Sequence, residues 1–132
     1  MHLSHRGVFQ TYGINLAPYE REIGAAIGVD PKAGTPVLVI AVPADLFQPD
    51  GSVVDNVRNP RWNGWADTPA GVAFDATLKD AMERQLPVHA YIRIEGSPNQ
   101  YFYTRHRDAR SLLVGRVTQW DGERYRIDFA RA

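Results

Sequence analysis

The chain is 132 residues long and carries 15 basic and 15 acidic side chains, so its formal net charge is zero. This length predicts one domain, spanning residues 1–132, with a core that needs no disulfide or structural metal. The absence of cysteine excludes disulfides, thiolate nucleophiles and cysteine-ligated zinc. No apolar run approaches the ~20 residues that a membrane helix needs, and we therefore expect a cytoplasmic protein with no membrane association.

The charges are unevenly distributed along the chain. Residues 1–92 hold seven basic and ten acidic side chains, whereas residues 93–132 hold eight arginines and five acids. Only Lys32 and Lys79 are lysines. Guanidinium groups form bidentate hydrogen bonds with phosphates, carboxylates and base edges, so an arginine-rich segment suits an anionic partner. A genome rich in G and C would produce the same arginine excess, and both explanations remain open.

The N-terminal half predicts one short strand, one helix and one buried strand. Residues 1–13 contain alternating apolar positions typical of an edge strand. A helix is expected over residues 15–28, because Asn15 suits an N-cap and Gly28 a C-terminal stop. Its apolar stripe recurs at three- and four-residue spacing through Leu16, Tyr19, Ile23 and Ile27. Residues 36–43 are continuously apolar, which predicts a strand buried on both faces of a sheet.

A long loop is expected over residues 44–71, followed by a second helix over residues 72–86. Loops of this length inside a compact domain are uncommon and are usually functional or mobile. The helix can begin at Thr68-Pro69 or at Asp75. Its apolar face is formed by Phe74, Leu78, Ala81 and Met82.

Residues 88–131 predict a four-stranded antiparallel meander. The first strand alternates, with Val88 and Ala90 inward and His89 and Tyr91 outward. Asp121-Gly122 predicts a two-residue hairpin. That register places Arg116 on the apolar face. Either a β-bulge near Gly115 shifts the register, or the long arginine stem lies along apolar surface, or Arg116 has a function in a groove.

Together these elements predict an α+β fold, in which two helices pack on a mostly antiparallel, strongly curved sheet or a small, partly open β-barrel. The order helix, strand, long loop, helix and four-stranded meander resembles small barrel domains that read bases, of the pseudouridine-synthase-associated (PUA-like) kind. This resemblance lies in the architecture alone, and no single motif carries it.

The strongest candidate site lies in the long loop, where Trp62 and Trp65 stand three residues apart. They are flanked by Arg58, Arg61 and Asn63, and flat rings beside arginines are typical of proteins that hold splayed bases. The alternative is that both indoles pin the loop to the core.

A second candidate site is the basic cluster Arg105, His106, Arg107 and Arg110, joined by Arg93 and by tyrosines of the sheet. Clustered arginines near aromatic rings suit a phosphate backbone. The alternative is a solvated sheet face on which the arginines pair with acids.

No catalytic or metal-binding motif is recognisable. His2 and His5 with His89 or His106 make a weak metal hypothesis, and surface or cap roles are favoured for these histidines. No glycine-rich phosphate loop or nucleophile elbow is present. We therefore expect neither cofactor nor metal.

Three hypotheses of function follow. The first is a non-catalytic recognition domain that binds nucleic acid or a nucleotide through the Trp/Arg loop and the arginine-rich sheet face. The second is a protein-binding accessory or inhibitor of the phage or mobile-element type, with the Trp loop as interface anchor. The third is a small enzyme acting on a nucleotide or sugar, with His106 or an acid as general base. Oligomeric state is not predicted.

Overall fold

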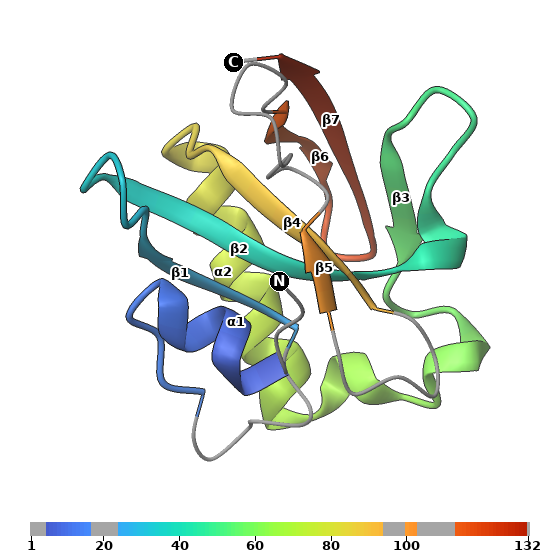
Figure 1. The fold of residues 1–132 in the computed structure, drawn as a ribbon. Helices are drawn as coiled ribbons and strands as arrows, with labels where there is room; N and C mark the ends of the chain where they lie inside the picture. The colour runs from blue at the N-terminus through green and yellow to red at the C-terminus, as the bar shows by residue number, and fades with distance from the viewer. Residues whose placement is uncertain (1–4, 17–23, 94–99, 103–112, 132) are drawn as a thin grey trace.

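The computed structural model describes residues 5–16, 24–93, 100–102 and 113–131, and these have an α+β fold (Figure 1). The elements are α1 (His5–Thr11), β1 (Ala25–Val29), β2 (Pro36–Pro43), β3 (Val53–Asn56), α2 (Pro69–Glu83), β4 (Val88–Arg93), β5 (Gln100–Phe102), β6 (Leu113–Trp120) and β7 (Arg124–Arg131). The strands form one sheet in the order β1-β2-β4-β6-β7-β3, with β5 paired to β4. Because β1 and β3 end this order, the sheet is open.

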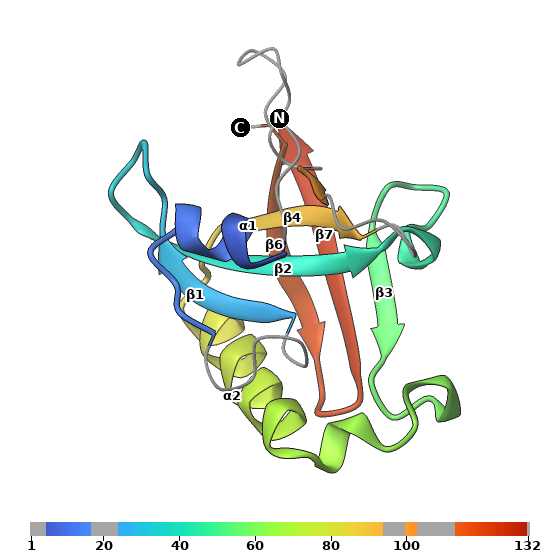
Figure 2. The same cartoon turned by 60° about the horizontal axis from the view of Figure 1, so that its bottom comes forward.

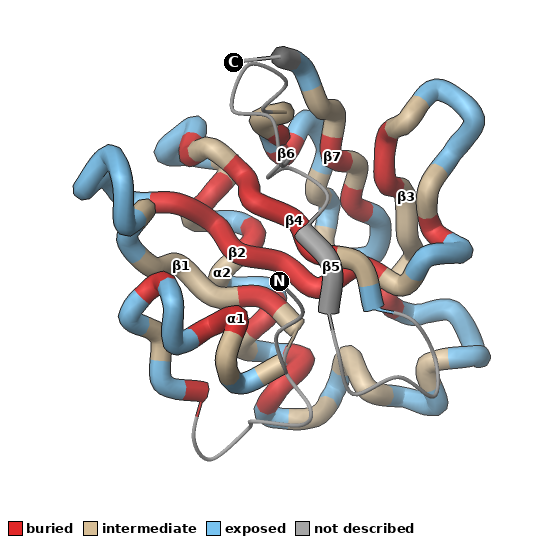
Figure 3. Tube along the Cα trace, viewed as in Figure 1, coloured by how far each residue is buried: buried red, intermediate tan, exposed pale blue. Residues whose placement is uncertain are grey.

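Strand β2 is an interior strand of the sheet, second in the order, which confirms the buried strand predicted for residues 36–43. It pairs antiparallel with β1 and parallel with β4. Residues 37–42 are all buried (Figure 3). Leu38, Ile40 and Val42 belong to one core cluster, whereas Val37 and Val39 belong to a second cluster on the opposite face. A strand needs such an unbroken apolar run only when both of its faces are covered.

Helix α2 covers one face of the sheet, and it confirms the second predicted helix with an earlier start. Thr68 is its N-cap and accepts a hydrogen bond from the Gly71 amide at 3.2 Å, with Pro69 in the first turn. The predicted apolar stripe is buried at Phe74 and Leu78, which pack in the same cluster as Leu38 and Ile40.

Helix α1 covers the other face, where the sequence had predicted an edge strand in residues 1–13. Val8, Phe9 and Tyr12 are buried at helical spacing against β2 and β4 (Figure 2). The prediction of outward-facing His89 and Tyr91 is therefore wrong, because α1 lies over them. The two buried rings find polar partners there: the Tyr12 hydroxyl is hydrogen-bonded to His89 Nδ1 at 2.9 Å, and the Tyr91 hydroxyl to His5 Nδ1 at 2.6 Å.

Two further boundaries differ from the expectation. The helix predicted for residues 15–28 is wrong at its C-terminal end, because Ala25–Val29 is strand β1; residues 17–23 lie outside the described residues. The loop predicted for residues 44–71 contains strand β3 and three short 3-10 turns, of which η2 (Pro60–Trp62) and η3 (Trp65–Asp67) carry the two tryptophans.

The meander also differs from a simple succession of neighbours. β5 and β6 both pair with β4, β6 through a single residue pair, Val88 with Gly115. The β6–β7 hairpin then runs across the direction of β2 in Figure 2, and β3 continues the sheet beyond β7. The sheet thus wraps around the core beneath α2. In the described part of the chain, no helix combines the length and apolarity needed to cross a membrane.

The hairpin register resolves the question of Arg116. The turn leaves three residues between the strands, and Trp120 lies opposite Tyr125, so the predicted two-residue register is wrong. A bulge is present, but at Thr118 rather than near Gly115. Val117 consequently faces the buried Ile127, and Arg116 lies exposed opposite Asp128.

Candidate functional site

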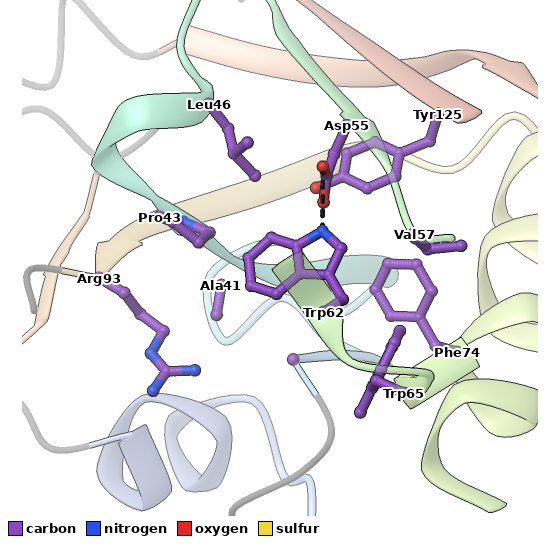
Figure 4. Close-up of a pocket in the computed structure, with 11 residues that line it drawn as sticks. Ala41, Pro43, Leu46, Asp55, Val57, Trp62, Trp65, Phe74, Arg93 and Tyr125 are labelled. Carbon is purple, nitrogen blue, oxygen red and sulfur yellow. Dashed lines mark hydrogen bonds between the residues drawn. The ribbon is translucent and has the colours of Figure 1, made fainter. Parts of the chain in front are cut away.

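A cavity of about 320 Å³ opens where the N-terminal half of α2, the η2 and η3 turns and strands β3 and β7 meet (Figure 4). We call it the aromatic cavity. The described residues that line it are Gly24, Ala41, Pro43, Leu46, Asp55, Val57, Trp62, Trp65, Phe74, Arg93 and Tyr125. Four of these are aromatic, and only Asp55 and Arg93 carry a formal charge.

The aromatic rings form a continuous wall. Trp65 packs edge-to-face on Phe74 with the ring centroids 5.2 Å apart, and Phe74 lies 5.9 Å from Tyr125. Such pairs are worth about 0.5–1.5 kcal/mol beyond the area that they bury. Because Phe74 is held by helix α2 and Tyr125 by strand β7, this wall is built on regular elements.

Trp62 is fixed from two sides. Its Nε1 donates a hydrogen bond to Asp55 Oδ1 at 3.2 Å, and the guanidinium carbon of Arg61 lies 4.4 Å from the centroid of its ring. Arg61 also donates a hydrogen bond to Asp45 Oδ2 at 2.8 Å. Arg61 therefore covers one face of the indole, and the ring still lines the cavity.

Asp55 is the acidic group of the cavity, and its pKa is raised. Burial is the main cause, because it penalises the charged carboxylate; the hydrogen bond from Trp62 opposes the shift. Strand β3 positions Asp55 directly opposite Tyr125 on β7. In Figure 4 the Tyr125 ring extends towards the Asp55 carboxyl.

Tyr125 presents a buried hydroxyl to this site. The residue is 3% exposed, and burial, with the charge of Asp55, raises its pKa well above the usual range. Among the described residues its hydroxyl has no hydrogen-bond partner. A buried hydroxyl without a partner costs about 1–3 kcal/mol, so such a group at a cavity wall points to a bound partner.

The predicted site residues of the long loop have different surroundings in the structure. Trp62 and Trp65 pack against the core, as the alternative interpretation of the pair expected, and both also line the cavity. Arg58 is paired with Asp67 Oδ1 at 3.0 Å. Asn63 adopts a left-handed conformation with φ of 55° and ends the η2 turn, which is a backbone role.

Of the predicted basic cluster, Arg93 lines this cavity. Arg105, His106, Arg107 and Arg110 lie outside the described residues. Arg116 points away from the cavity, because its strand neighbour Val117 faces the core that forms the cavity wall and successive strand residues face opposite sides. Its guanidinium donates a hydrogen bond to the Gly115 carbonyl at 2.9 Å.

Sequence reasoning missed Asp55, Phe74 and Tyr125 as site residues and treated Arg93 only as an adjunct of the basic cluster. The alternation of Tyr125, Ile127 and Phe129 did indicate an inward-facing tyrosine. Asp55, the residue opposite Tyr125, could not be recognised as its neighbour before strand β3 was known to pair with β7. Among the described residues, no three histidine or acidic side chains gather as metal ligands.

Comparisons with known proteins add no assignment: no protein-family model, no curated protein and no solved structure matches the chain.

Proposed function

We propose that this chain is a non-catalytic recognition module that binds a single nucleobase in the aromatic cavity. The base would belong to a nucleotide or to a single nucleic-acid strand. The observation that carries the proposal is the combination of aromatic walls with one polar end, where Asp55 stands opposite the unpartnered hydroxyl of Tyr125. Binding pockets are typically apolar with a few convergent polar groups.

The size of the cavity supports one ring system as the ligand. Ligand pockets usually measure about 300–1,000 Å³, and about 320 Å³ is at the lower end of this range. Trp62 and Trp65 offer surfaces on which a base can stack, and base–aromatic stacking is worth about 1–3 kcal/mol. A sugar needs more hydrogen-bonding groups than the described lining provides.

Arg93 is the basic residue best placed for a phosphate. It lines the cavity, lies exposed at the end of β4, and has no ion pair among the described residues. Arg58 and Arg61 are already paired with Asp67 and Asp45, so they support the loop instead. For a single strand that extends beyond the cavity, we propose further phosphate contacts by Arg105, His106, Arg107 and Arg110.

The proposal rests on the cavity and takes no support from the PUA-like architecture expected from the sequence. A protein interface anchored by the tryptophans has less support. Interface anchors insert into a pocket of the partner, whereas Trp62 and Trp65 are half-buried and line a cavity of their own chain.

The test is a titration of the protein with the four ribonucleoside monophosphates and with a short mixed-sequence single strand. Binding is followed by calorimetry and by tryptophan fluorescence. We expect at least one nucleotide to bind, and Trp65→Ala to weaken this binding by about 1–3 kcal/mol, the usual value of one stacking contact.

The matched control is Trp120→Phe, because Trp120 is not among the described lining of the cavity. Its ring packs on Phe74 and Tyr125, with centroids 6.2 and 6.5 Å apart, and phenylalanine keeps an aromatic ring in that place. The change removes the hydrogen bond from the Trp120 Nε1 to the exposed Asp75. This variant should bind as the wild type does. Absence of binding by every nucleotide and by the strand, at millimolar concentration and low salt, would refute the proposed function.

A further inference from the structure

The four aromatic rings of the cavity come from four separate elements and stand at steep angles to one another. Trp62 belongs to η2, Trp65 to η3, Phe74 to α2 and Tyr125 to β7. The ring planes of Trp65 and Phe74 are inclined by 73°, and those of Phe74 and Tyr125 by 53°. Rings inclined in this way enclose a space from several sides (Figure 4). Because the face of an aromatic ring carries partial negative charge, such an enclosure suits a cation with apolar surface.

Asp55 adds a full negative charge to this wall and has no cation of its own among the described residues. Its carboxylate accepts the Trp62 indole N–H at 3.2 Å and the backbone N–H of Asn56, and both donors are neutral. The charges of Arg61 and Asp45 act on the Asp55 pKa in opposite directions, and these two side chains pair with each other at 2.8 Å. A half-buried carboxylate that is hydrogen-bonded but not paired with a positive charge favours a ligand that supplies one.

The second charge of the lining is positive and lies apart from the first. Arg93 is exposed at the C-terminal end of β4, and its charge is not among those that influence the pKa of Asp55. Figure 4 shows the Arg93 side chain well away from the Asp55 carboxyl. The cavity therefore offers negative charge among the rings and positive charge at its exposed end. This arrangement is complementary to a flat cation that also carries an anionic group.

We infer that the cavity takes a positively charged, ring-N-methylated nucleobase, with the ring among the aromatic side chains, its charge facing Asp55 and the phosphate at Arg93. This inference rests on the proposed function and names the class of base. Methylation of adenine or guanine at a ring nitrogen can leave the base cationic just below neutral pH. The methylated ring stays flat and gains apolar surface, so it can stack on the tryptophans. A bare quaternary ammonium group would also suit the rings and Asp55, but it has nothing to offer Arg93.

The experiment compares two isomers that differ in the position of one methyl group and therefore in charge. The ring of 1-methyladenosine monophosphate is cationic just below neutral pH, whereas the isomer methylated on the exocyclic amino group has a neutral ring. Both are titrated by calorimetry at that pH and one low salt concentration, together with 7-methylguanosine monophosphate and guanosine monophosphate. At least one methylated cation should bind about tenfold tighter than its neutral counterpart, as expected of a desolvated cation–π contact.

Asp55→Asn is the diagnostic variant, because it removes the charge and keeps an acceptor for the Trp62 indole. It should reduce the preference for the cation to less than about threefold and change the affinity for the neutral isomer by less than about twofold. The matched control is Glu83→Gln, which removes the same charge from the exposed C-terminal end of α2, outside the described lining. Its preference should equal that of the wild type. A full preference retained by Asp55→Asn would contradict the inference.

Two substitutions of Trp65 separate the π face from the apolar bulk of the side chain. Phenylalanine keeps a π face, so Trp65→Phe should retain part of the preference for the cation, whereas Trp65→Leu should retain less. The readout is the ratio of the two isomers' affinities, because an unfolded fraction would weaken both isomers alike. Circular dichroism checks that each variant is folded. An unchanged ratio in folded Trp65→Leu would contradict the inference.

The remaining outcomes separate the two proposals. Equal affinity within both nucleotide pairs would overturn the inference and leave the proposed function standing. No binding of any nucleotide, methylated or not, or of a strand would overturn both. Tetramethylammonium that binds as tightly as the methylated nucleotides would overturn the inference, because the ring and the phosphate would then contribute nothing. A short strand with the methylated base that binds tighter than the monophosphate would support the inference with nucleic acid as the source of the base, and equal affinity would support it with the free nucleotide.

Discussion

Two aspartates of this chain are predicted to have opposite effects on stability as the pH changes, because their surroundings differ. The pKa of Asp55 is raised above its ordinary value of 3.8, mainly by burial. The folded protein therefore holds this proton more tightly than the unfolded chain does. The free energy of unfolding consequently falls as the pH rises from about 3.8 through the folded pKa of Asp55.

Asp55→Asn should remove this loss. The asparagine keeps an acceptor for the Trp62 indole, so the packing of the cavity is retained. We expect the stability of the variant relative to the wild type to increase with pH through that window and then to become constant. Urea unfolding at half-unit steps from pH 3.5 to 7 measures it. A relative stability that declines with pH would show that the carboxylate is stabilised in the folded state instead.

Asp50 provides the reverse case. Its pKa is lowered to about 2, chiefly by hydrogen bonds from the side chain and backbone of Ser52 and then by Arg126. The stability that it contributes is present above its ordinary pKa and is lost as the pH falls from about 4 to about 2. Asp50→Asn should therefore be less stable than the wild type at neutral pH, and the difference should vanish near pH 2. A difference independent of pH would exclude the ionised carboxylate as its cause.

At the scale of elements, the contact between α2 and the η3 turn positions Trp65. Gly71 is buried in the first turn of α2, and a Cβ there would lie 2.6 Å from both the Cα and the carbonyl oxygen of Ala66. Glycine to alanine inside a helix normally gains up to about 1 kcal/mol. Overpacking costs about 1–3 kcal/mol, so it should outweigh that gain.

Gly71→Ala should accordingly lower the free energy of unfolding by up to about 2 kcal/mol, because a clash with backbone atoms belongs at the upper end of the overpacking range and the helix gain offsets about 1 kcal/mol of it. The variant should also shift the tryptophan fluorescence emission, because the η3 turn, which carries Trp65, must move. The control is Ala76→Gly on the exposed side of the same helix, which reports the propensity effect alone, a loss of about 1 kcal/mol with unchanged emission. A stabilised Gly71→Ala would mean that η3 does not pack on this glycine.

The elements that sequence patterns predicted well are those whose environment is uniform along their length. The unbroken apolar run of β2 and the Thr68-Pro69 start of α2 are examples. The helix predicted across residue 25 was wrong because Ala25–Val29 pairs with β2, and this tertiary pairing overrides local preference. For α1 the signal existed: Val8, Phe9 and Tyr12 recur at one, three and four residues, which is helical spacing rather than alternation.

The candidate site was predictable only in part for a related reason. Trp62 and Trp65 can be recognised in the sequence because they are large rings in a polar loop. The Asp55–Tyr125 pair depends on the register of β3 with β7, two strands with about half of the chain between them. A one-residue slip would place Asp55 opposite a different side chain and on the other face. Sequence patterns therefore located the stacking groups and missed the polar pair.

At the scale of the whole molecule, the neutral net charge conceals a positive C-terminal part, and this predicts how salt affects strand binding. If Arg105 and Arg107 each contact a phosphate, the double alanine variant should reduce the slope of log affinity against log salt by about 1.4, since each contact to a single strand contributes about 0.7. Mononucleotide affinity should be nearly unchanged, because the aromatic cavity holds the base. The measurement is strand binding at 50–300 mM salt, and an unchanged slope would remove these arginines from the interface.

The sheet order also predicts unequal local stability. Strand β2 is an interior strand, with neighbours on both sides and both faces buried, whereas the four-residue β3 is at one end of the order and pairs with β7. Amides open by local unfolding most easily where few buried contacts resist it. Hydrogen exchange should therefore be slowest in β2 and much faster in β3 and in the η2 and η3 turns.

This gradient connects fold and site, because Asp55, Trp62 and Trp65 come from the faster-exchanging segments whereas Tyr125 and Phe74 come from β7 and α2. A ligand in the cavity bridges the two parts. A saturating nucleotide should thus slow exchange in residues 53–67, and the slowest amides of β2 should slow as well, because global unfolding also releases the ligand. A bound ligand stabilises the folded protein by RT ln(1 + [L]/Kd). When the free ligand concentration is a hundredfold above Kd, this gain approaches about 2.7 kcal/mol. It applies to amides that exchange through an opening that releases the ligand. Unchanged exchange in residues 53–67, or protection confined to residues outside the cavity wall, would place the nucleotide elsewhere on the molecule.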